Sequence, residues 1–177
     1  MFLKSSAAGK PTRRKSPAFQ KPQYYKFSLA TVIVFNRQRK VAISIPKVRD
    51  IVSFLLDRAR VKYDQVIFSF VSKKEIQRLH AISHGDSSFT DCITFPYDAS
   101  GEGGFTVLGE AFICPEAAVV YCEENGGDVH EEITLYIIHT LLHMLGYDDI
   151  EPKDRARMRQ AERRWMTSLK QNTLSLN

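Results

Sequence analysis

The chain has 177 residues, of which 44% are hydrophobic, so it can bury a real core and is not a disordered chain. Its most apolar predicted strand, Leu29 to Phe35, is far too short to cross a bilayer, which argues against a membrane protein. The three cysteines lie at no metal-ligand spacing, and we expect packed, reduced thiols in a cytoplasmic protein.

The net charge of +5 conceals a strong asymmetry along the chain. Twelve Lys and Arg and no carboxylate precede Asp50, whereas fourteen Asp and Glu and no Lys or Arg lie between Arg78 and Lys153. The basic segment at residues 1–26 suits a polyanion such as RNA, and it equally suits a solvated tail that only aids solubility. We expect this tail to be flexible and residues 27–177 to form a single domain.

The predicted strands and helices mix without strict alternation. In chain order we expect a strand at 27–35, a short strand or extended lead-in at 41–45, a helix at 46–60, a strand at 65–71, a helix at 72–80, a polar loop at 81–89, a strand at 91–95, a loop at 97–104, a strand at 107–114, and helices at 115–124, 128–145 and 152–169. The predicted fold class is therefore α+β, with a small mixed sheet of about four strands packed with about five helices.

The helix predicted at residues 128–145 is apolar almost all round, which is typical of a central, buried helix. It contains His139 and His143, whose spacing puts both imidazoles on one face, about one turn apart, where they can share a cation. Gly146 supplies the turn that ends the helix, and Asp149 can swing back to the same point. These three side chains are the predicted ligands of one divalent metal ion per chain, with zinc preferred, at the C-terminal end of the helix.

The spacing of the ligands is that of the metzincin zinc site, His-x3-His-x2-Gly-x2-ligand. Metalloproteases with this spacing carry a general-base Glu directly after the first His. Here that position is Thr140, so a peptidase would lack its proton acceptor. The alternative without a metal is a core pair of histidines, with Asp148 and Asp149 acting as turn residues.

The segment from His139 to Asp149 resembles the signature of the YbeY family, bacterial and organellar single-strand endoribonucleases of ribosomal RNA maturation. That family reads His-Gly-x-x-His-x-x-Gly-x-Asp-His. Two further blocks match in the right order. Residues 79–96 resemble the family's "LN…RG…TDVLSFP", and residues 108–115 resemble its "LGDIVIC". Three ordered blocks make the resemblance specific, and it spans roughly residues 27–169.

The resemblance implies a metal-dependent endoribonuclease acting in ribosomal RNA maturation and ribosome quality control, with single-stranded ribosomal RNA and the small ribosomal subunit as partners. It implies that His139, His143 and Asp149 hold Zn²⁺ or another divalent metal. Two positions depart from the family: its third ligand, His, is Asp149 here, and its loop Arg, thought to assist catalysis, aligns with His84. His84 is thus the catalytic candidate, either as a protonated phosphate-binding group or as an acid or base. An exposed loop histidine is the alternative.

Two other functions stay open on the sequence. One is a non-catalytic ribosome-associated factor in which the metal only stabilises the end of the helix. The other is a different zinc hydrolase. Asp91 and Glu110 are expected to serve structure near the sheet edge, or else to orient a ligand imidazole. Because the acidic middle region would repel phosphates, the basic tail and the helix that contains Lys153 to Arg164 are expected to supply the counter-charge.

Overall fold

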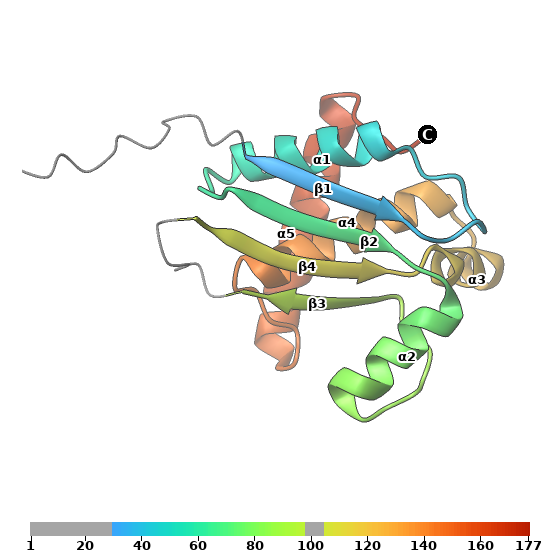
Figure 1. Cartoon of the computed structure of the whole chain (residues 1–177). Helices are drawn as coiled ribbons and strands as arrows, with labels where there is room; N and C mark the ends of the chain where they lie inside the picture. Colours follow the sequence, from blue (N-terminus) through green and yellow to red (C-terminus); the bar gives the residue numbers. More distant parts are fainter. Residues whose placement is uncertain (1–29, 98–104) are drawn as a thin grey trace, which may run out of the picture.

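The computed structural model describes residues 30–97 and 105–177. The predicted basic tail at residues 1–26 lies outside these ranges, and so does most of the loop predicted at residues 97–104. The described residues form four strands and five helices, which confirms the predicted α+β class (Figure 1). The elements are β1 (Thr31–Asn36), α1 (Ile45–Arg58), β2 (Gln65–Phe70), α2 (Lys73–His84), β3 (Cys92–Pro96), β4 (Val107–Ile113), α3 (Pro115–Asn125), α4 (Val129–Met144) and α5 (Pro152–Gln171).

The sheet is mixed, with strand order β1-β2-β4-β3. β1, β2 and β4 run parallel, and β3 is an antiparallel edge strand beside β4. α1 packs on β1, and α4 packs on β3 and β4 with α5 against it. In the view of Figure 1, α4 and α5 lie behind the sheet, and α2 projects below it. The edge strand and α4 therefore face one another, which sets the position of the site described below.

Residues 41–44 lead into α1 without forming a strand, which is one of the two forms expected for residues 41–45, and Ile45 already belongs to the helix. The Gln38 side chain caps a tight turn before them: its Oε1 accepts from the Lys40 N–H at 2.7 Å and its amide donates to the Val41 carbonyl at 2.8 Å. The polar loop predicted from residue 81 was wrong for residues 81–84, which continue α2. The helix ends only at Gly85, whose φ of 70° supplies a left-handed cap.

A bulge in β4 brings β3 close to it. Val107 pairs with Gln65 and Glu110 pairs with Ile67, so β4 carries one more residue than β2 in this stretch. Gly109 lies in the bulge with a φ of 152°, and a Cβ there would lie 2.4 Å from the Phe95 carbonyl oxygen. Only glycine accepts this approach of the edge strand.

α4 is the central helix of the core, as predicted. It begins at Asp128, whose carboxylate accepts the N–H of Glu131 at 2.8 Å. Its fully buried side chains are Ile133, Ile137, Ile138, Thr140, Leu141 and Leu142. Among the described residues, no helix combines the length and the apolar character that crossing a membrane requires. The long apolar pattern of α4 thus reflects burial in the protein core.

Candidate metal centre

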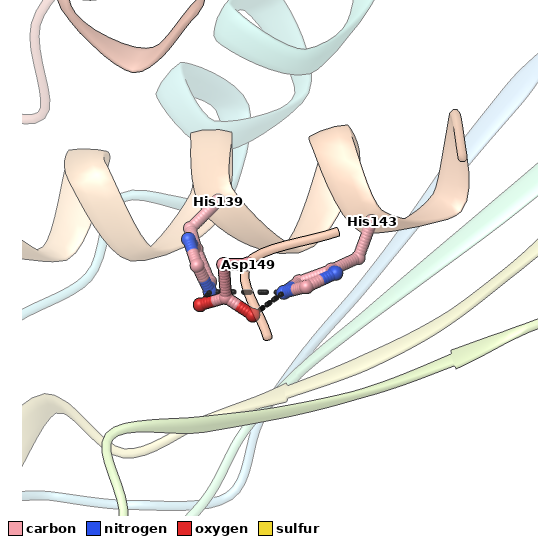
Figure 2. A group of neighbouring side chains, drawn as sticks. All are labelled: His139, His143 and Asp149. Atoms are coloured by element: carbon pink, nitrogen blue, oxygen red, sulfur yellow. Dashed lines mark hydrogen bonds and ion pairs between the residues drawn. The ribbon is translucent and has the colours of Figure 1, made fainter. Parts of the chain in front are cut away.

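The three predicted ligands come together at the end of α4. Figure 2 shows His139 and His143 pointing from the same face of the helix toward the carboxylate of Asp149. Their ligand atoms all lie within 4.8 Å of one another. The two Nε2 atoms are 3.0 Å apart, and each lies 3.8 Å from a different oxygen of Asp149. Each side chain is partly exposed, so the cluster is open to solvent on one side.

The other ring nitrogen of each histidine is held by an acceptor. Nδ1 of His139 lies 2.7 Å from Oε1 of Glu162, and Nδ1 of His143 lies 3.0 Å from the carbonyl oxygen of Tyr147. Both acceptors are satisfied by a proton on Nδ1, so the Nε2 atoms, which face each other, are the nitrogens available to a metal ion. A cation between the rings would satisfy both Nε2 atoms at once.

The cluster fits a zinc ion in chemistry and in size. Two imidazoles and one carboxylate are the ligand set of many catalytic zinc sites. Ligand atoms about 2.0–2.1 Å from a tetrahedral zinc are about 3.3 Å from one another, and the distances here, 3.0 and 3.8 Å, bracket that value. Three ligands leave a fourth position for water or substrate.

Electrostatics around His139 favour a positive charge. Burial alone would lower the pKa of His139, but the hydrogen bond and charge of Glu162, together with the charges of Asp149 and Asp91, outweigh burial and raise the pKa. The same negative groups would attract a metal ion to Nε2 in place of a proton. A cation of either kind is therefore stabilised at this point.

The loop that carries Asp149 is fixed at both ends. At its start, Gly146 has a φ of 85°, its N–H donates to the His143 carbonyl, and the Tyr147 N–H donates to the Leu142 carbonyl, both at 3.0 Å. This is a Schellman motif. At its end, Arg155 of α5 donates from Nε to the Asp149 carbonyl at 3.0 Å. A second bond from the same guanidinium reaches the next carbonyl, that of residue 150, at 2.9 Å. These hydrogen bonds at both ends hold the loop, and with it Asp149, beside the two histidines.

The predicted ligands line a cleft of about 380 Å³ between the end of α4 and the edge strand β3. His84, the catalytic candidate, lines the same cleft from the last turn of α2, beside His80, with ring centroids 5.1 Å apart. Its Nδ1 lies 2.7 Å from the hydroxyl of Ser83, so Nε2 is the atom left for a substrate. The structure thus brings His84 and the three predicted ligands to one cavity. No Lys or Arg of the described residues lines it.

The hydrogen bonds of Asp91 and Glu110 favour a structural role for both residues. Asp91 lines the cleft, but its Oδ1 accepts from the neighbouring Cys92 N–H at 2.7 Å and so shapes the start of β3. Glu110 accepts a long bond of 3.4 Å from Ser69. Burial, followed by the charge of Asp91, raises the pKa of Cys92 well above its usual value.

The residue that holds the imidazole of His139 in place is Glu162, which the sequence reasoning missed. Its side chain is only 14% exposed although it lies on a helix rich in arginine. A signal for it exists in the sequence: it stands four residues after Met158 and three before Trp165, both buried, so helical periodicity places it at the edge of the packed face.

A family model described as "Endoribonuclease YbeY" matches residues 33–170. The chain belongs to the YbeY family. Among curated relatives, "Endoribonuclease YbeY" of Protochlamydia amoebophila is 38% identical over 135 residues, covering 76% of this chain and 90% of the relative. "Endoribonuclease YbeY" of Chlamydia caviae is 38% identical over 144 residues, covering 79% and 91%. A protein of Thermotoga maritima with a known solution structure shares the fold, with a TM-score of 0.57 and 20% identity over 77% of this chain and 87% of that one.

Proposed function

We propose that this YbeY-family protein is a metal-dependent endoribonuclease that cleaves single-stranded RNA in the maturation and quality control of ribosomal RNA. The observation that carries the proposal is the convergence of two imidazoles and a carboxylate in an open cleft, in a chain whose relatives are named endoribonucleases. The proposed ligands are His139, His143 and Asp149, and the preferred ion is Zn²⁺.

The bound metal would polarise a phosphoryl oxygen and lower the pKa of a coordinated water. The chain's own residues do the positioning: Glu162 and the Tyr147 carbonyl fix the ring orientation of the two histidines, and Arg155 fixes the loop of the third ligand. His84, from the opposite wall of the cleft, is proposed to bind a phosphate oxygen when protonated or to move a proton at Nε2.

A peptidase is disfavoured by the place of Thr140. Its side chain is fully buried, and its hydroxyl donates to the carbonyl oxygens of Tyr136 and Ile137, at 3.0 and 2.9 Å. It is neither in the cleft nor free to accept a proton, so the position that carries the general base in metalloproteases has a purely structural role here.

The proposed setting is the cytoplasm, with the small ribosomal subunit as partner. Cys92, Cys114 and Cys122 are all free thiols, as expected in a reducing compartment. The absence of Lys and Arg from the lining of the cleft within the described ranges also favours a second candidate, a ribosome-associated factor whose metal only staples the end of α4.

The deciding experiment is cleavage of a labelled single-stranded RNA by the full chain supplied with Zn²⁺ or Mn²⁺, beside the same sequence as a duplex. We expect cleavage of the single strand, and a loss of at least about 100-fold in His143→Ala with unchanged circular dichroism. The matched control is His130→Ala, a histidine on the first turn of the same helix and outside the cleft. If the wild-type protein binds metal but cleaves neither the single strand nor the duplex, the endoribonuclease proposal is wrong. The non-catalytic ribosome-associated factor is then the remaining candidate.

A further inference from the structure

A second hollow, of about 440 Å³, lies on α5 outside the metal cleft. It is formed by the end of α1 and one face of α5. Its lining consists of Arg58, Gln160, Arg163, Arg164, Thr167, Ser168 and Gln171. We call it the arginine hollow. Every lining side chain can donate a hydrogen bond, and none is a carboxylate, so its chemistry is that of an oxyanion site.

The three arginines of the hollow are exposed and not neutralised. Among residues 30–97 and 105–177, the ion pairs of Lys and Arg join Arg78 to Glu75, Arg157 to Asp154 and Lys170 to Glu131. Arg58, Arg163 and Arg164 make none of them. Three like charges gathered on one concave surface repel each other, and a bound anion would relieve that repulsion.

A buried hydroxyl supports the presence of a ligand. Ser168 is 4% exposed, and its Oγ is the buried side-chain atom that lacks a hydrogen-bond partner in the described part of the chain. An unmade bond of this kind is costly, and Ser168 is one of the residues that line the hollow, together with the three arginines.

We propose that the arginine hollow binds the phosphodiester backbone of the single-stranded RNA whose cleavage is proposed above, at a point beyond the metal cleft. The inference rests on that proposed function, because a cleft that contains Asp91 and Asp149 and no described Lys or Arg offers a polyanion no counter-charge beyond the proposed metal ion and His84. Planar guanidinium groups with amide and hydroxyl donors hold phosphates without reading the sequence.

A third hollow adjoins the arginine hollow and extends to the residues just before Asp149. A neighbouring hollow of about 700 Å³ shares Gln160 and Arg164 with the arginine hollow. It reaches Tyr147 and Asp148, which directly precede the ligand Asp149. Asp148 and Asp154 also line this third hollow, and their negative charges disfavour phosphate binding there. We therefore place the main phosphate contacts in the arginine hollow itself.

The test is binding of a fluorescent single-stranded RNA to the full chain, measured by anisotropy in EDTA over a series of salt concentrations. The variant is Arg58→Gln/Arg164→Gln. Its control, Lys153→Gln/Arg159→Gln, removes the same charge from exposed positions of α5 that do not line the hollow. Because the basic tail is present in both proteins, the difference between them isolates the hollow.

We expect the hollow variant to bind about tenfold more weakly than the control at about 0.1 M salt, and its plot of log affinity against log salt to be flatter by about 1.4, the value for two lost phosphate contacts. Gln171→Glu, which puts a carboxylate into the hollow with little change of shape, should weaken binding in the same direction and covers the case in which the double variant misfolds.

Hollow and control variants that bind RNA within twofold of each other overturn the proposal. So does a hollow that binds inorganic phosphate through its arginines while RNA affinity is unchanged. Since cleavage plays no part in the EDTA assay, a protein that binds RNA through the hollow and never cleaves it would refute the proposed nuclease and leave this inference standing.

Discussion

Replacing Glu162 with Gln tests whether this carboxylate tunes the metal centre. The change keeps an oxygen acceptor beside Nδ1 of His139, 2.7 Å away in the wild type, and removes the negative charge. Because the Glu162 side chain is only 14% exposed, solvent screens that charge little. A hydrogen bond to a charged group contributes about 1.5–3 kcal/mol and a neutral one about 0.5–1.5 kcal/mol. The lost charge thus costs about 1–1.5 kcal/mol, or about tenfold in the zinc dissociation constant.

Competition with a zinc chelator measures the effect on the purified full chain. We expect Glu162→Gln to release zinc at about one tenth of the chelator strength that the wild type withstands, and Glu162→Ala, which also frees the ring, to lose more. Glu131→Gln is the control, since that carboxylate is half exposed and pairs with Lys170 instead. A Glu162→Gln protein that holds zinc as tightly as the Glu131→Gln control would refute the assigned role.

Two further predictions concern the loop of the third ligand and the start of α4. Arg155→Ala removes both hydrogen bonds to the carbonyls of residues 149 and 150, so zinc affinity should fall several-fold in the same chelator assay. Arg155→Lys should recover part of the affinity, and Arg159→Ala should not change it. An unchanged affinity in Arg155→Ala would show that the loop keeps its position without Arg155. Asp128→Ala removes the cap of α4 and should lower the free energy of unfolding by about 1 kcal/mol in urea at neutral pH. The backbone hydrogen bond from Glu131 lowers the pKa of Asp128, so this stabilisation is present above the unfolded pKa and is lost as the pH falls through the folded one. The difference between wild type and variant should therefore shrink in acid, and a difference that grows there would contradict the capping role.

The clustering of His139, His143 and Asp149 was predictable because these residues are close in sequence. Helical spacing put His139 and His143 on one face, and the glycine turn at Gly146 brought Asp149 back to them, all within eleven residues. Glu162 comes from 23 residues away, on another helix, and such a contact depends on how α4 and α5 pack. No pattern within one element reveals that packing.

The fold divides in a similar way. The elements follow from local patterns, and the class from their order. The strand order β1-β2-β4-β3 and the antiparallel edge strand are set by long-range pairing, which the sequence reasoning did not predict. The place of His84 in a helix was missed because residues 81–84 were grouped with the polar residues that follow Gly85, although Gly85, the stop signal, comes only after His84.

The bond between Nδ1 of His143 and the Tyr147 carbonyl has a thermodynamic consequence. One imidazole closes the last turn of α4 through that bond and points its other nitrogen at the metal position. Binding of an ion would therefore oppose unwinding of the helix end, and an intact helix end would strengthen ion binding by the same free energy. Without the ion, α4 would fray first at its C-terminal turn. With the ion bound, the amides of that turn would be the most strongly protected from hydrogen exchange. Occupancy would then be recorded in the backbone itself, in the exchange rates of the Gly146 and Tyr147 protons, with no need to observe the ion.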